Sequence, residues 1–301
     1  MKPSQSQRLS LRGLDHHVHT WGDPAAPKLF LLHGWMDVGA SFQFLVDALA
    51  GDWYAIAPDL RGYGRSAWQA QGYWFPDYVA DLEALIDAFA PDETVALVGH
   101  SLGGNIVLQY AGVRPERVRR VVSLEGFGIP AENALGAPEK FAAWLDALAR
   151  PIRFAPYPGM EAVALRLQKN NPRLPADKAL FLARHWAEEL PDGSARLLSD
   201  PRHKLPFPTV YRLEEVYAVW RRISAPVLWL AAENSSIPKW LGDHPEGAGG
   251  GGGDKLDGIR RRLAHIPHGR LVTIPDAGHM LQHDQPAAVA AAIEPFLAAD
   301  R

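Results

Sequence analysis

The stretch that most constrains the fold of this chain is residues 96–111, which read ALVGHSLGGNIVLQYA. Small apolar residues suited to a buried strand run into Gly-His-Ser-Leu-Gly-Gly, and an apolar pattern typical of a helix follows directly. Gly-x-Ser-x-Gly between a strand and a helix predicts a strained turn, whose small flanking residues let the strand and the helix approach each other. Such a turn lifts the hydroxyl of Ser101 above the sheet, and the helix that follows points its N-terminus at the same place, where negative charge is favoured.

Short apolar runs alternate with helical patterns on both sides of this turn. Strand-like runs are KLFLLHG (28–34) and WYAIAPD (53–59), and helix-like runs are SFQFLVDALA (41–50) and DYVADLEALIDAFA (77–90). The strand pattern returns near the end of the chain in APVLWLAAE and GRLVTIPDAG. This alternation predicts the α/β class, with a mostly parallel sheet and helices on both faces.

The alternation of strand and helix patterns stops between residues 126 and 222. Prolines punctuate this segment, strand patterns disappear, and runs such as KFAAWLDALAR and DKALFLARHWAEEL are helical. We therefore predict a core of residues 1–125 and 223–301, interrupted by a helical insertion over 126–222. The run GAGGGGG (247–253) predicts a flexible loop within the second core segment.

Charge and composition exclude several classes of function. The 301 residues carry a formal net charge of −3, which gives no electrostatic case for nucleic acid or an anionic membrane surface. Cysteine is absent, so neither a thiolate metal site nor a Cys nucleophile is available. The N-terminus lacks the apolar core of a signal peptide, and no apolar run reaches the ~20 residues of a membrane helix, so we expect a cytoplasmic protein without membrane insertion.

A serine hydroxyl needs a base, and the base needs an acid to orient it. In folds with this turn the acid and then the histidine follow the serine along the chain. His279 stands behind Ala277 and Gly278, after the last strand-like run, and is the predicted base. His283 is a competitor, but it lies at or near the final helix.

An oxyanion hole needs two preorganised donors. One is the backbone N–H of Leu102, directly after the predicted nucleophile. The other is the N–H of Trp35 in the loop after KLFLLHG, where Gly34 permits a close approach and His33 braces the loop.

Four blocks, LFLLHGWMDVGASF, APDLRGYGRS, LVGHSLGG and IPDAGHMLQHDQP, are similar in order to the signature blocks of the α/β-hydrolase superfamily. HGWMD, PDLRGYGRS and SDPRH…YRLEE resemble its serine-hydrolase-like branch. The resemblance covers about residues 9–125 and 223–300. It implies the α/β-hydrolase fold, with a mostly parallel eight-stranded sheet and a helical lid inserted after the sixth strand.

The acid departs from the usual pattern of that superfamily. In many members it follows the strand after the lid, but the corresponding position here is Asn234, whose amide cannot stabilise an imidazolium as a carboxylate does. Haloalkane dehalogenases resemble this chain in another respect, because they keep a catalytic Glu 24 residues after the nucleophile, where this chain has Glu125. We predict Glu125 as the acid, with Glu233 as the alternative. Both dehalogenase and epoxide-hydrolase chemistry are disfavoured, because they need an Asp nucleophile.

These residues predict a carboxylesterase-like serine hydrolase that acts through an acyl-enzyme on an ester, a thioester or a related acyl compound with an apolar part. Two alternatives stay open: hydrolysis of a C–C bond by the same residues, and a non-catalytic binding protein on the same fold. We expect a small-molecule substrate and no cofactor. The sequence names neither the substrate nor the oligomeric state.

Other residues receive weaker assignments. Trp144 and Trp186 are predicted to wall a substrate pocket under the lid, and a lid arginine that reached inward would suit an acidic substrate group. We predict no metal site: His17 and His19 share a strand face but are too few for a closed zinc site. Asp59 and Arg61 are predicted to brace their loop.

Overall fold

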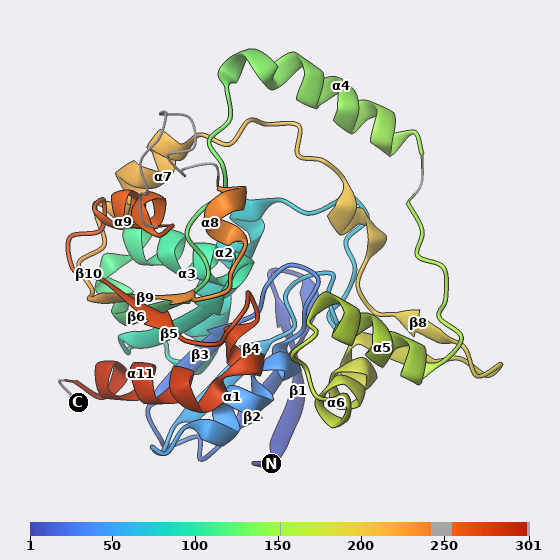
Figure 1. Ribbon diagram of the computed structural model, residues 1–301, viewed down its shortest axis with the longest axis horizontal. Helices are drawn as coiled ribbons and strands as arrows, with labels where there is room; N and C mark the ends of the chain where they lie inside the picture. The colour runs from blue at the N-terminus through green and yellow to red at the C-terminus, as the bar shows by residue number, and fades with distance from the viewer. Residues whose placement is uncertain (151, 242–254, 300–301) are drawn as a thin grey trace.

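A computed structural model describes residues 1–150, 152–241 and 255–299, and it has a central eight-stranded sheet with helices on both faces (Figure 1). The strands lie in the order β1-β2-β4-β3-β5-β6-β9-β10. β1 and β2 are antiparallel to each other, β2 is antiparallel to β4, and every other neighbouring pair is parallel. The predicted α/β class and mostly parallel eight-stranded sheet are confirmed.

The strands of the sheet are short, and those between the edge strands β1 and β10 are mostly buried. Their bounds are β1 Ser4–Leu11, β2 Leu14–Trp21, β3 Lys28–Leu32, β4 Tyr54–Pro58, β5 Val95–His100, β6 Val118–Leu124, β9 Val227–Ala232 and β10 Gly269–Ile274. The helices that flank it are α1 Gln43–Ala48, α2 Phe75–Phe89, α3 Leu102–Val113, α7 Leu213–Trp220, α8 Ile237–Trp240, α9 Asp257–Leu263, α10 Leu281–Asp284 and α11 Pro286–Ala298.

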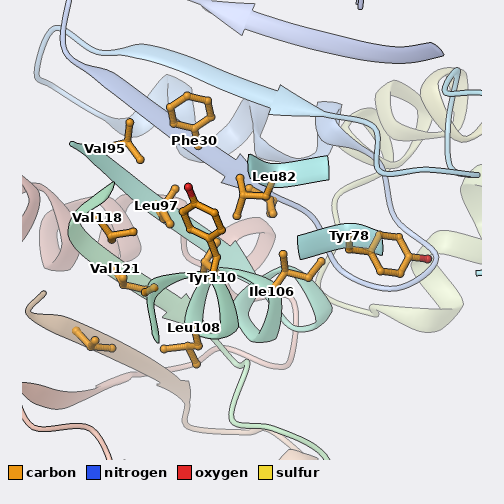
Figure 2. Packing of buried hydrophobic residues seen from close by; sticks show 14 of the residues in the cluster. Phe30, Tyr78, Leu82, Val95, Leu97, Ile106, Leu108, Tyr110, Val118 and Val121 are labelled. Carbon is orange, nitrogen blue, oxygen red and sulfur yellow. The ribbon is translucent and has the colours of Figure 1, made fainter. Parts of the chain in front are cut away.

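Alternation along the buried strands divides the core into two layers. In β5, Val95 and Leu97 join the cluster under α2 and α3, whereas Ala96 and Val98 join the cluster under α1 and α11. Successive side chains of a strand point to opposite faces, so a strand covered on both faces must be apolar throughout. Figure 2 shows the first layer, where Tyr110 of α3 lies among side chains of β5, β6 and α2.

In its described residues, the segment between β6 and β9 contains three α-helices that are not part of the flanking layers, together with a small sheet. The helices are α4 Ala137–Leu148, α5 Met160–Asn170 and α6 Ala176–Trp186, and the antiparallel strands are β7 Ala187–Glu189 and β8 Ala195–Leu197. The expectation that this segment lacks strands was therefore wrong. A turn with Gly193 at φ +80° joins two runs too short to leave a strand pattern in the sequence.

Two parts of the segment between β6 and β9 differ in how much of their surface is buried. α5 and α6 form a small apolar core of their own that includes Phe44 of α1, and this contact ties them to the main sheet. α4 has no buried residue and stands apart from α5 and α6 in Figure 1. The predicted flexible loop at 247–253 lies outside the described residues. Within those residues, no helix is both long enough and apolar enough to cross a membrane.

Candidate active site

Ser101 occupies the sharp turn between β5 and α3 that the sequence predicted. Its φ is +52°, which places a non-glycine residue in the left-handed region. The glycines of this turn are needed for the close approach of strand and helix: a Cβ on Gly99 would lie 2.2 Å from the carbonyl oxygen of Gly103, and one on Gly103 would lie 2.0 Å from that of Leu32. The side chain of Ser101 therefore begins at the carboxyl end of the sheet, beside the first free N–H groups of α3.

The structure brings Glu125 and His279 together from positions 154 residues apart in the chain. Nδ1 of His279 lies 3.3 Å from Oε2 of Glu125. Glu125 directly follows β6, the neighbour of β5, so its carboxylate and Ser101 project from adjacent strand ends. The glutamate side chain has no exposed surface, whereas one third of the histidine side chain is accessible.

Further donors hold the Glu125 carboxylate. The backbone N–H of Ala232 donates to Oε1 at 2.7 Å, and the hydroxyl of Ser235 donates to Oε2. Both donors come from the end of β9 and the loop after it. In many α/β-hydrolases this loop carries the catalytic acid. Here the same loop instead donates hydrogen bonds to the carboxylate of Glu125, which follows β6.

The alternative acid, Glu233, does not contact His279. It is exposed, and its Oε2 accepts a hydrogen bond of 2.9 Å from the N–H of Asp276. The neighbouring Asn234 uses its backbone N–H to bind the carbonyl oxygen of Ala277 at 2.8 Å. Both residues thus hold the loop that precedes His279. His283, the competing base, is buried in α10 with its ring against that of Phe44.

His100 connects the serine turn to the loop that carries His279. The sequence analysis did not predict this contact. Its Nε2 donates a 2.8 Å hydrogen bond to the carbonyl oxygen of His279, and the two rings lie 4.8 Å apart. Burial lowers the pKa of His100 well below its usual value, and the nearby His279 lowers it further, so the ring stays neutral. Among the described residues Ser101 and His279 are not hydrogen-bonded to each other, and such bonds are often long before a substrate binds.

The loop predicted to hold the oxyanion lies against the serine. A Cβ added to Gly34 would lie 3.3 Å from the Cβ of Ser101 and 2.9 Å from Nδ1 of His100. His33 hydrogen-bonds to this loop: its Nε2 accepts from the N–H of Leu60 at 2.8 Å, which leaves the proton on Nδ1 to donate to the carbonyl oxygen of Gly34. Leu102 begins α3, so its N–H has no acceptor within the helix.

A segment that carried no function in the sequence analysis fixes the side chain of Trp35. The carbonyl oxygen of His203 accepts a 3.2 Å hydrogen bond from the Trp35 indole. The His203 ring is stacked between Tyr63 and Tyr73, with 3.7 Å between ring centres on each side. The hydroxyl of Tyr73 donates to the Asp200 carboxylate at 2.7 Å. The SDPRH run thus joins the PDLRGYGRS loop to the Trp35 loop.

Backbone strain gathers around this site. Five non-glycine residues in the described part of the chain have positive φ: Arg12, Met36, Ser101, Glu125 and Asp276. All but Arg12 belong to loops that meet at the serine. Strained conformations of this kind cost about 1–3 kcal/mol each and persist where the surrounding structure holds them.

A cavity of about 660 Å³ opens where the Trp35 loop ends. It is lined by Trp35, Met36, Arg153, Phe154, Ala155, Pro156, Tyr157, Pro158, Val163, Arg166, Leu167, Asn170, Trp186, Leu197 and Lys204. The predicted pocket residue Trp186 is among them, and its indole donates to the Asp37 carboxylate at 3.2 Å. Trp144 is not; it stands on α4 with its ring near those of Trp74 and Phe141.

The buried polar residues beside the sheet behave as braces. The Asp59 carboxylate accepts from the N–H groups of Gly39 and Arg65 and from Nδ1 of His17. Ligand atoms of His17, His19 and Asp59 lie within 4.8 Å of one another, which is the one arrangement among the described residues that could hold a metal ion. Because the carboxylate already has these three donors, its observed role is to hold the loops together.

The family follows from comparison with known proteins. The model of the alpha/beta hydrolase fold family matches residues 27–286, and the chain belongs to that family. Within it the chain falls in the serine-hydrolase-like branch. A serine hydrolase-like protein of Danio rerio is 30% identical over 224 residues, which are 71% of this chain and 67% of that protein.

Two further similarities extend over almost the whole chain. A 3-hydroxybutyrate-oligomer hydrolase of Cupriavidus necator is 29% identical over 318 residues, or 97% of each protein. The structure of a thioesterase domain from the curacin biosynthetic pathway superposes with a TM-score of 0.82 over 97% of this chain and 99% of that one; at 22% identity this likeness shows the fold. The chain is thus placed among hydrolases.

Proposed function

We propose that this protein is a serine hydrolase that cleaves an ester or thioester through an acyl-enzyme. The observation that carries the proposal is the pairing of the buried Glu125 with Nδ1 of His279, next to a serine on a strained strand-to-helix turn. An accepting carboxylate at Nδ1 leaves Nε2 free of its proton and able to take one from a hydroxyl.

The proposed reaction has two halves. The Ser101 oxygen attacks the carbonyl carbon while Nε2 of His279 takes the hydroxyl proton, and the N–H groups of Leu102 and Trp35 bind the oxyanion. The bond to the alcohol or thiol then breaks, and His279 returns the proton to that leaving group. Water attacks the acyl-enzyme in the same way, its proton passes through His279 to Ser101, and a carboxylic acid leaves. Glu125 stays ionised throughout and stabilises the imidazolium.

The segment 126–222 is proposed to act as a lid, with the core formed by 1–125 and 223–301. Support comes from the cavity, whose wall combines Trp35 of the oxyanion loop with residues of α5 and Trp186 of α6. Most of that wall is apolar, which suits a substrate with an apolar part.

Two observations favour ester hydrolysis over the alternatives. The non-catalytic reading rested on the missing acid after the lid, and Glu125 supplies a carboxylate to His279 from another strand. C–C hydrolysis would use the same residues, but the relative from Cupriavidus necator acts on oligomers of 3-hydroxybutyrate, whose links are esters.

Labelling with a fluorophosphonate probe tests the nucleophile. We expect the folded wild-type protein to be labelled at Ser101 and to release p-nitrophenol from p-nitrophenyl esters. Ser101→Ala should lose both reactions while it keeps the circular dichroism spectrum of the wild type. If the folded protein is not labelled, or if Ser101→Ala still turns over the ester at the wild-type rate, the proposal is wrong.

A further inference from the structure

The charged residues that line the cavity next to the Trp35 loop are all of one sign. Three of its lining residues are cationic, namely Arg153, Arg166 and Lys204, and no lining residue is acidic. Asp37, which the Trp186 indole touches, is buried and does not line the cavity. A substrate that enters this cavity meets positive charge set in an otherwise mostly apolar wall.

The placement of Arg166 follows from the spacing of α5. Val163, Arg166, Leu167 and Asn170 all line the cavity, and they follow one another at steps of three, one and three residues, so they share one helix face. Val163 and Leu167 are buried and belong to the small core of the lid, which fixes the helix in rotation. Arg166 is therefore held on the face that borders the cavity.

The two arginines of the cavity have no carboxylate partner within the described part of the chain. Around Arg166 on α5, the positions three and four residues away are Val163, Ala162, Lys169 and Asn170, none of them acidic. Other arginines of the same segment are paired: Arg196 binds Glu188, and Arg202 binds Asp200. An unpaired guanidinium beside apolar walls has donors to offer to a ligand.

One loop lies between the cavity and the reacting centre and contacts both. Gly34 lies against Ser101, and the next residue, Trp35, lines the cavity. A substrate whose carbonyl sits at Ser101 and whose far end passes Trp35 would enter this cavity. Phe154 lies on that lid side with the ammonium of Lys204 4.8 Å from its ring centre.

We propose that the cavity binds a carboxylate at the far end of the substrate, so that the preferred substrates are esters or thioesters that carry a free carboxylate away from the scissile bond. This proposal rests on the serine hydrolase function proposed above. Arg166 and Arg153 would hold the carboxylate, because a guanidinium can donate two parallel hydrogen bonds to it. Lys204 would add attraction without fixed geometry.

A matched pair of substrates tests this proposal. p-Nitrophenyl pentanoate and mono-p-nitrophenyl glutarate have the same chain length and leaving group, and they differ by a terminal methyl or carboxylate. We expect the wild-type kcat/KM to be about 10-fold or more higher for the glutarate at low ionic strength, and the preference to shrink in 0.5 M salt. Arg166→Gln and Arg153→Gln should each lower the ratio of the two kcat/KM values about 10-fold, and Arg166→Lys should keep part of it.

Arg184→Gln serves as the control, because it removes an exposed arginine of α6 that does not line the cavity. It should leave the ratio at the wild-type value. If the wild type does not prefer the glutarate, or if Arg184→Gln changes the ratio as much as Arg166→Gln does, carboxylate binding in this cavity is refuted. Hydrolysis of the pentanoate and labelling of Ser101 would persist in that case, whereas failure of the hydrolase proposal would remove both.

Discussion

At the scale of single residues, the local sequence around Glu125 does not predict that it is the proposed acid. Glu125 has φ +57° and lies one residue beyond β6, where no loop pattern marks it as catalytic. Its carboxylate is fully buried, yet it accepts from a backbone N–H, a hydroxyl and an imidazole. Burial of an ionised carboxylate is costly unless such donors satisfy it, so the set of donors is what allows a glutamate here.

Glu125→Gln should lower kcat by roughly 10²–10⁴ with the fold retained. The amide cannot offer its negative charge to the imidazolium formed during attack, and loss of an Asp partner costs about 10⁴ in a well-characterised serine triad. Glu233→Gln is the matched control, since Glu233 is exposed and binds the N–H of Asp276 instead. It should cost about tenfold or less. Steady-state kinetics with a p-nitrophenyl ester, beside a thermal melt of each variant, decides the matter: a larger loss in Glu233→Gln would reverse the assignment.

At the scale of elements, the turn at Ser101 and the buried strands of the sheet could be predicted because their patterns are local, whereas the exposed edge strand β1 was not predicted. A buried strand, a glycine-rich turn and a helix follow one another without interruption in ALVGHSLGGNIVLQYA. The strands β7 and β8 and the role of the SDPRH run could not, because three-residue strands leave no periodicity and a ring stack forms only after distant loops meet. Of the site, the choice of Glu125 over Glu233 came from a family resemblance, and the contacts of His100 and His203 came from the structure alone.

The stacked ring of His203 is expected to position the Trp35 loop, the proposed source of one oxyanion donor, from a distance. His203→Ala removes the ring between Tyr63 and Tyr73 and should loosen the carbonyl group that holds the Trp35 indole. We expect kcat to fall about 10-fold with a small change in KM, and the fluorescence of Trp35 to shift. His203→Phe keeps an aromatic ring in the stack and should recover most of the loss. Equal losses in the two variants would show that the ring stack does not set the position of the loop.

At the scale of the whole molecule, the protein holds several neutral imidazoles in buried or half-buried positions. Burial is the main cause that lowers the pKa of His19 to about 4 and of His203 to about 3, and it also lowers the pKa of His33, His100, His185 and His283. The shifted pKa of Asp59 likewise makes the folded protein less stable as the pH falls. Burial works against its charge, but the hydrogen bond from His17 and its other partners lower its pKa to about 2.

These shifts predict a protein that loses stability on the acid side of neutrality. Between the ordinary pKa of 6.5 and the folded value of about 4, His19 binds a proton in the unfolded chain but not in the folded one, so each drop in pH favours unfolding. From pH 7.5 to pH 5.0 this residue alone should remove about 2 kcal/mol from the free energy of unfolding. Asp59 adds its share progressively below about pH 5, as the unfolded carboxyl, with an ordinary pKa of 3.8, takes up a proton that the folded one does not bind until about pH 2. Urea unfolding at the two pH values measures the difference. His19→Gln should flatten the dependence by about that amount, and the exposed His268→Gln should leave it unchanged; a stability that stays constant down to pH 5 would contradict the assignment of neutral, buried histidines.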